Sequence, residues 1–499
     1  MKLGISEDAS LGAKAGRAIG WSLASTALGR LSTLAIGIAL ARLLGPAEFG
    51  TFAVAMVALV ALLSFNELGV SLAIVRWPGE PREIAPTVAT ISVLTSVLIY
   101  VGCFFGAPAF ASAMGDPSAA SVVRVLSLNV IISGLVATPV ALLQREFRQD
   151  RKTIADLTTT WTSAVVSIGC ALTGMGAMSL AVGQMTGAAA GAVLFFIFAP
   201  RGLRFGFDRT QARKLLKFGL PLAGSSIVVF AVQNVDRLII GAVLGPISLG
   251  YYVLAANLSN WPVNVFSAPV RSVAPAALSR LQHDPPAMRR TFLSTAGLLA
   301  AVVLPACAVL AGLAEPMIRL VYGEIWEPAA VVLVWLAVLA ALRILFELIY
   351  DYFVVLGNSR AVFTVQVVWL AALIPATYLG ATLAGLNGAS GAQVAVAAFV
   401  VLPFYLYELY RAGIRPAQVG ARLLLPIVGA LVAAAICVGV VALGLPDLLT
   451  LAVGGVAGAG VMVLLAYRLR GVLRELRAIG SEPPVPAPAE QNAPAPAGP

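Results

Sequence analysis

Three charged side chains form a row in an otherwise apolar part of the chain. Arg343, Glu347 and Asp351 are spaced four residues apart, which places them on one face of a helix. The surrounding segment, 328–356, is long and apolar enough to cross a bilayer. A charge near the middle of such a helix costs about 2.5–3.5 kcal/mol on insertion scales, so Arg343 should face a cavity or a partner rather than lipid. A guanidinium there could bind an anion, and the carboxylates could bind a proton or a cation.

Other apolar segments carry polar groups of the same kinds. The candidates for binding an anionic substrate are Arg30, Arg237, Arg271, Arg343, Asn234 and Asn264. The candidates for coupling to an ion are Asp236, Glu67, Glu347 and Asp351. Asp236 and Arg237 point about 100° apart around a helix, so they need not neutralise each other. The alternative interpretation is that these charges pair with one another and only fix helix packing.

The residues that most enzymes need are missing from this pattern. The chain has no phosphate-binding loop, no Asp-x-Asp metal motif and no cluster of Cys and His. Its single histidine, His283, lies in a polar run and is interpreted as a solvated loop residue. We therefore expect no catalytic residues, no metal and no cofactor, and a protein that is not an enzyme.

The elements that must position these side chains are membrane-spanning helices. Of the 499 residues, 60% are hydrophobic and only 11% are charged, which exceeds what the core of a soluble domain can hide. The sequence predicts an all-α, polytopic membrane protein with about fourteen transmembrane helices. The expected spans are 18–43, 49–75, 86–112, 119–143, 154–175, 178–199, 218–243, 248–277, 291–314, 328–356, 361–383, 388–410, 423–443 and 448–467.

The distribution of charge predicts the orientation. Most of the 33 Lys and Arg residues fall at the two termini and in every second gap between spans. The positive-inside rule therefore places both termini of this multi-pass protein in the cytoplasm. This rule also accounts for the net charge of +10 without nucleic acid as a partner.

The chain also contains an internal repeat. The stretch 41–55 (ARLLGPAEFGTFAVA) aligns with 241–255 (GAVLGPISLGYYVLA) at an offset of 200 positions, with Gly-Pro and a later Gly in register. Six predicted spans separate the copies, so both halves should have the same orientation. We expect two parallel-repeat six-helix bundles, 1–208 and 209–412, then two additional C-terminal helices in 413–480 and a disordered cytoplasmic tail, 481–499. The bland alternative is a recurrent helix-ending turn.

Several runs resemble the polysaccharide transporter (Wzx-type) flippases of the multidrug/oligosaccharidyl-lipid/polysaccharide exporter superfamily. They are 218–221 (FGLP), 234–241 (NVDRLIIG), 244–255 (LGPISLGYYVLA), 262–264 (PVN) and 275–282 (PAALSRLQ), together with 41–55. The resemblance implies a V-shaped pair of bundles that moves undecaprenyl-diphosphate-linked oligosaccharide across the inner membrane for surface polysaccharide biosynthesis. It implies basic residues that meet the diphosphate, coupling to H⁺ or Na⁺, membrane lipid as a partner and contact with polysaccharide assembly proteins. Asp236 lies within the matching motif.

Two other functions stay open. A multidrug or cation antiporter of the same superfamily would favour acidic cavity residues, and Arg30, Arg271 and Arg343 argue against it. A polysaccharide polymerase or ligase would be an enzyme acting on the same lipid carrier, and the short outer gaps argue against a catalytic domain there.

Overall fold

The computed structural model describes residues 11–66, 74, 81–146, 148–199, 204–263, 265, 278–282 and 284–470. Within these ranges, only the backbone is described for residues 11–34, 65–66, 81–82, 149, 216, 218–229 and 359. The described part of the chain is helical and contains no strand. The predicted tail 481–499 lies outside the described residues.

The helices form two compact units. The first comprises Met1–Leu254, Ile318–Ala329 and Thr377–Ala389, and the second comprises Ala255–Met317, Ala330–Ala376 and Ser390–Pro499. The first unit holds α1 (Leu11–Asn66), α3 (Pro81–Ala113), α4 (Ala119–Arg145), α5 (Gln149–Leu172), α6 (Ala177–Phe198), most of α7 (Arg209–Pro262), the end of α10 (Ala314–Tyr322) and η2 (Glu324–Trp326). The second holds α9 (Pro285–Gly312), most of α11 (Ala329–Val355), η3 (Ala397–Val401), α13 (Leu402–Arg411), α14 (Pro416–Ala442) and α15 (Asp447–Arg468), and α12 (Ser359–Val396) contributes to both.

At three of the predicted breaks between spans, the backbone is non-helical and two helices meet at a kink, within α1, α7 and α12. Gly45 in α1 has φ 72° and ψ 174°, and Gly245 in α7 has φ 82° and ψ 179°. Gly385 in α12 has φ 58°. Side chains make this region of backbone space costly, so glycine is required at each break. The two repeat copies thus share one turn conformation at matched positions.

In the first unit, α5 and α6 pack through small residues. Gly183, Gly187 and Gly191 of α6 are four residues apart and lie against the row Thr159, Ser163 and Ser167 of α5. A Cβ added at Gly187 would lie only 2.7 Å from Cβ of Ser163. Such close backbone approach is how helices associate where lipid removes the hydrophobic driving force.

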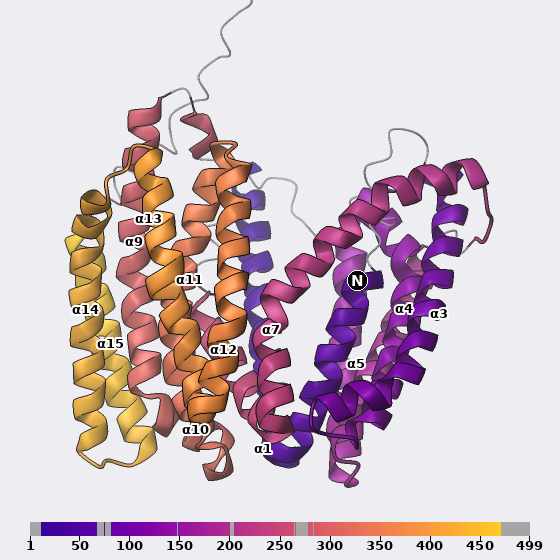
Figure 1. Cartoon of the computed structure of the whole chain (residues 1–499), viewed down its shortest axis with the longest axis horizontal. Helices are drawn as coiled ribbons and strands as arrows, with labels where there is room; N and C mark the ends of the chain where they lie inside the picture. The colour runs from indigo at the N-terminus through magenta and orange to yellow at the C-terminus, as the bar shows by residue number, and fades with distance from the viewer. Residues whose placement is uncertain are drawn as a thin grey trace, which may run out of the picture. The chain divides into compact units, whose positions relative to one another are not determined.

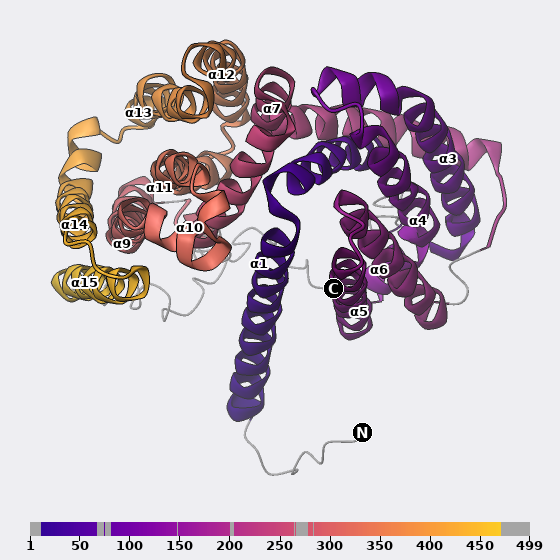
Figure 2. The same cartoon turned by 90° about the horizontal axis from the view of Figure 1, so that it is seen from below.

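Glycines play the same part in the second unit. Gly454 and Gly458 of α15 lie against Leu313 and Val309 at the end of α9, and Gly312 of α9 lies against Cys437 of α14. The antiparallel helices α14 and α15 are drawn in gold and yellow in Figure 1, and Figure 2 shows them nearly end-on. The free thiol of Cys437 is buried at this contact.

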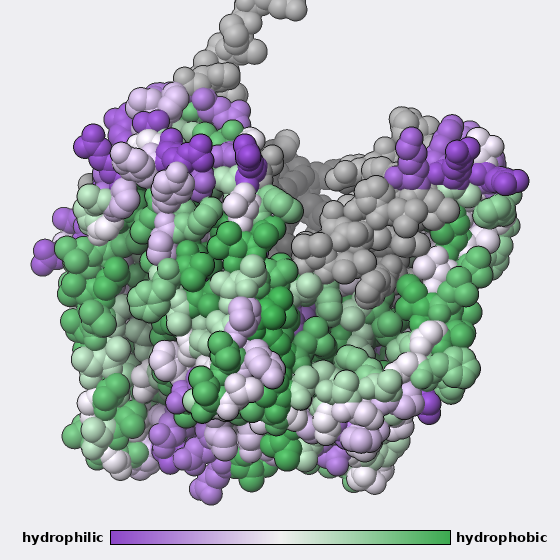
Figure 3. All heavy atoms as spheres, viewed as in Figure 1, coloured by the Kyte–Doolittle hydropathy of each residue, from purple (hydrophilic) through white to green (hydrophobic). Residues whose placement is uncertain are grey.

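The described helices have the length and composition of membrane spans. Ten of them are long and apolar enough to cross a bilayer. Apolar side chains cover the middle of α14 and α15, and hydrophilic side chains gather at the upper ends of the helices (Figure 3). The protein is therefore an all-α, multi-pass membrane protein, as predicted. The fourteen-span repeat layout and the domain boundaries at 208 and 412 stay predictions.

Candidate functional site

The two repeat turns pack against each other within the first unit. A Cβ added at Gly50 would lie 2.6 Å from the carbonyl carbon of Pro246, and one added at Gly250 would lie 2.8 Å from the carbonyl oxygen of Pro46. The contact is reciprocal, since the offset of 200 exchanges Gly50 with Gly250 and Pro246 with Pro46. A two-fold relation between the copies produces this exchange. We call the crossing of 44–52 and 244–252 the turn junction.

Trp326 of η2 closes the turn junction on one side. Its buried indole meets the rings of Phe49 and Tyr251 edge-on, with centroids 5.5 Å and 5.9 Å away. Its Nε1 donates to the carbonyl oxygen of Ala41 at 3.1 Å. Nε of Arg42 donates to the carbonyl oxygen of Val321 at 2.7 Å. The segment 318–326 is thereby fixed to both repeat copies.

Other predicted outer gaps join the same end of the first unit. The hydroxyl of Thr51 donates to the carboxylate of Asp116 at 2.6 Å. The carboxylate of Glu48 accepts a hydrogen bond of 2.7 Å from the backbone N–H of Ala177, at the start of α6. Gaps that the sequence assigns to one side of the membrane therefore lie together in the structure.

A polar cluster lies on α7, about 13 Å before the turn at Gly245 by helical rise. The hydroxyl of Tyr252 donates to the half-buried carboxylate of Asp236. Nη1 of Arg237 donates to Oδ1 of the buried Asn234 at 3.3 Å. Within the described residues, the side chain of Arg237 therefore contacts the Asn234 amide, and that of Asp236 contacts the Tyr252 hydroxyl. The structure brings together three of the predicted residues and adds a fourth, Tyr252.

The charged row predicted on one helix face lies on α11 in the second unit. Arg343 stands at the middle of this 27-residue helix and is exposed, whereas Glu347 is half-buried and Asp351 is buried. Among the described residues, Arg343 forms no ion pair or hydrogen bond, while Glu347 and Asp351 both interact with neighbours. An exposed guanidinium at the middle of a span must meet water or an anionic ligand.

Some of the predicted site residues cannot be placed. Glu67, Asn264, Arg271 and His283, and the side chain of Arg30, lie outside the described residues. No group of three or more metal-binding side chains occurs within the described ranges.

The sequence reasoning missed Tyr252 and Trp326. Tyr252 carried a usable signal, because two helices joined by a tight turn bring residues at similar distances from it side by side. Asp236 precedes Gly245 by nine positions and Tyr252 follows it by seven. For Trp326 there was no such signal, since its partners are far away in the sequence.

Comparison with known proteins agrees with this architecture. The chain is 26% identical to the succinoglycan biosynthesis transport protein ExoT of Rhizobium meliloti (strain 1021) over 64% of its own length and 65% of that relative, a little under two thirds. It is 23% identical to the lipopolysaccharide biosynthesis protein WzxC of Escherichia coli (strain K12), over 70% of this chain and 71% of that one.

A solved structure extends the likeness of fold to nearly the whole chain. The lipid II flippase MurJ in an inward closed conformation superposes with a TM-score of 0.74 at 15% identity, covering 91% of this chain and all of that one. The family described as "Polysaccharide biosynthesis protein" matches residues 39–331, which is more than half of the chain and includes both repeat turns. The protein therefore belongs to this family of polysaccharide biosynthesis proteins, as the resemblance of its motifs to Wzx-type transporters predicts.

Proposed function

We propose that the chain is a flippase that moves undecaprenyl-diphosphate-linked oligosaccharide from the inner to the outer leaflet of the bacterial plasma membrane, for the synthesis of a surface polysaccharide. The relatives ExoT and WzxC support this process, since ExoT is named a transport protein and both are named for polysaccharide biosynthesis. A transporter needs no catalytic residue of its own, so the protein acts without enzymatic activity.

The observation that carries the proposal is the exposed, unpaired Arg343 at the middle of α11, within the described residues. A lipid diphosphate is an anion that cannot cross about 30 Å of hydrocarbon unaided. A guanidinium matches it with a rigid fork of donors. The hydrocarbon tail can stay in lipid while the diphosphate passes this charge.

We further propose that two parallel-repeat bundles, 1–208 and 209–412, alternate between inward-facing and outward-facing states, and that both termini are cytoplasmic. The charge distribution supports this orientation, which places the turn junction outside. A cysteine introduced at the exposed Glu324 should react in intact cells with a thiol reagent that cannot cross the membrane. Reaction only after the cells are opened would contradict the orientation.

The function is tested in cells by the position of the cargo. Deletion of the gene should leave complete lipid-linked repeat units on the cytoplasmic leaflet and remove the surface polymer. The measurement is the accessibility of these units to an added glycosidase or lectin in intact cells. Accessible units that accumulate without being polymerised would point instead to a polymerase or ligase.

Asp236 is our candidate for coupling transport to an ion gradient. Asp236→Asn keeps an acceptor for the Tyr252 hydroxyl but removes the charge that a proton or Na⁺ would neutralise. We expect transport in reconstituted vesicles to slow and to lose its response to an imposed H⁺ or Na⁺ gradient. Tyr252→Phe is the complementary control, because it removes the hydrogen bond that Asp236→Asn keeps and it keeps the carboxylate that Asp236→Asn removes. A variant at Asp236 that still responds fully to the gradient would move coupling to another carboxylate, with Glu67 and Asp351 next.

A further inference from the structure

Helix α5 differs from its neighbours in the first unit. Its 24 residues span about 36 Å, enough to cross the hydrocarbon core, yet it is not among the ten apolar helices. Its amino-terminal half instead carries three consecutive threonines, Thr158 to Thr160, after a charged first turn. Polar and charged side chains are costly within a membrane, so their presence on a spanning helix indicates a function.

Two faces of α5 have ordinary roles. One face, with Thr159, Ser163 and Ser167, packs against the glycines of α6. Another carries exposed apolar side chains suited to lipid, which are Ile154, Leu157, Trp161, Val165 and Leu172. Neither face includes the row formed by Lys152, Asp156 and Thr160, which are four residues apart.

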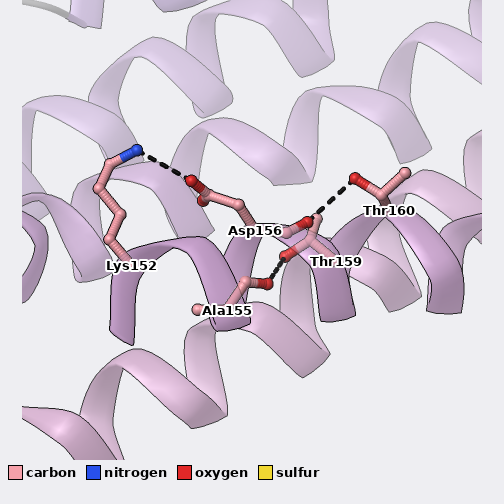
Figure 4. A network of polar contacts seen from close by, with 5 residues as sticks. All are labelled: Lys152, Ala155, Asp156, Thr159 and Thr160. Atoms are coloured by element: carbon pink, nitrogen blue, oxygen red, sulfur yellow. Dashed lines mark hydrogen bonds and ion pairs between the residues drawn. The ribbon is translucent and has the colours of Figure 1, made fainter. Parts of the chain in front are cut away.

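The members of this polar row contact one another (Figure 4), and Asp156 is exposed while Lys152 and Thr160 are half-buried. Nζ of Lys152 lies 2.9 Å from Oδ2 of Asp156, whose side chain is 53% exposed. The hydroxyl of Thr160 donates to the backbone oxygen of Asp156 at 3.0 Å. The next position of the row, Ala164, is buried. The row is therefore open over its first two turns and closed beyond them.

By helix length, two members of the row, Asp156 and Thr160, lie within the hydrocarbon core, and Lys152 lies at its edge. If α5 ends at the membrane boundary near Leu172, a core of about 30 Å extends back by about 20 residues, to Thr153. Asp156 then lies almost one helical turn inside, and any tilt of the helix places it deeper. An exposed carboxylate less than one turn inside the boundary reaches toward water or a hydrated ligand rather than toward hydrocarbon.

We propose that Lys152, Asp156 and Thr160 form a contact surface for the sugar hydroxyls of the transported oligosaccharide. Sugar hydroxyls are hydrogen-bond donors, and the Asp156 carboxylate accepts them strongly. The hydrogen of the Thr160 hydroxyl is used by the backbone, so its oxygen is left as an acceptor. Lys152 supplies donors and keeps the row electrically neutral. The inference rests on the proposed function and adds the part of the cargo that α5 touches.

The experiment compares two cargoes in vesicles that contain the full chain. One probe is undecaprenyl diphosphate bearing a single labelled sugar, and the other bears a labelled oligosaccharide. Asp156→Asn should slow the oligosaccharide about tenfold, the equivalent of one lost charge-assisted hydrogen bond, and leave the single sugar unaffected. Thr160→Val should slow the oligosaccharide by about threefold. Lys152→Gln removes the ion pair but keeps the carboxylate and neutral donors, so it should slow the oligosaccharide less than Asp156→Asn does.

Thr158→Val is the matched control. The Thr158 hydroxyl donates to the backbone oxygen of Ile154 at 2.9 Å, as Thr160 does to Asp156, but it lies on a different face. The control should transport both cargoes at the wild-type rate. Equal slowing of both cargoes in Asp156→Asn, or no difference between Thr160→Val and Thr158→Val, would overturn the contact surface while the flippase function stands. A wild-type chain that moves neither cargo would overturn the proposed function itself.

Discussion

Replacing Gly50 by leucine is expected to abolish transport and to prevent accumulation of folded protein, whereas the same replacement at Gly37 should do neither. Both glycines lie on α1, but a Cβ at Gly37 meets nothing within 4 Å, and one at Gly50 meets the backbone of Pro246 and Ile247. Backbone atoms of a neighbouring helix cannot move aside as a flexible side chain can. The turn junction therefore requires glycine at this position.

Alanine gives a graded version of the same test. Alanine is favoured over glycine in helices by about 1 kcal/mol, so Gly37→Ala should be neutral or stabilising. Overpacking costs about 1–3 kcal/mol in a filled site, and more where backbone is struck, so Gly50→Ala should lower the melting temperature in detergent. The reciprocal contact predicts the same direction for Gly250→Ala. Equal melting temperatures for Gly50→Ala and Gly37→Ala would mean that the two turns do not pack as described.

Loss of Arg343 is expected to reduce transport by at least about tenfold while leaving the amount of folded protein unchanged. The estimate corresponds to about 1.5–3 kcal/mol for a hydrogen bond to a charged group. Because Arg343 has no partner among the described residues, Arg343→Ala should not strand a buried charge. Arg343→Lys should retain part of the activity, since an ammonium keeps the charge and loses the fork.

The matched control for Arg343 is Arg360, which is exposed near the start of α12 rather than at the middle of a span. Arg360→Ala should transport normally. Wild-type rates in Arg343→Ala, measured on protein present at the normal amount, would show that this arginine does not meet the cargo.

Much of the helical framework could be predicted because apolar runs and glycine turns are local signals. The span predicted at 119–143 is α4, Ala119–Arg145, and the break predicted at Gly45-Pro46 is the non-helical residue Gly45. Bounds differed where a helix continues beyond the hydrocarbon. The span predicted at 86–112 is part of α3, Pro81–Ala113, and that predicted at 423–443 overlaps α14, Pro416–Ala442, which begins earlier. Hydropathy marks the part of a helix in lipid, whereas backbone hydrogen bonding decides where it ends.

The site was only partly predictable, because sequence spacing fixes a face but not what that face meets. Arg343, Glu347 and Asp351 lie on the single helix α11, as predicted. They differ in burial, however, since Arg343 is exposed and Asp351 is buried. Asp236 has Tyr252 as a partner across the turn, and Trp326 reaches Ala41 from far away in the sequence. These partners are set by tertiary packing, which no local pattern records.

The most direct test of the proposed function is transport by the purified chain alone. Vesicles of bacterial phospholipid would carry undecaprenyl diphosphate with a labelled oligosaccharide in one leaflet, and an enzyme or quencher added outside would report its arrival in the other. We expect the wild-type chain to move the label faster than empty vesicles, and Arg343→Ala to move it at least about tenfold more slowly than the wild type. Wild-type vesicles that exchange the label no faster than empty ones, with correctly folded protein present, would contradict the proposal.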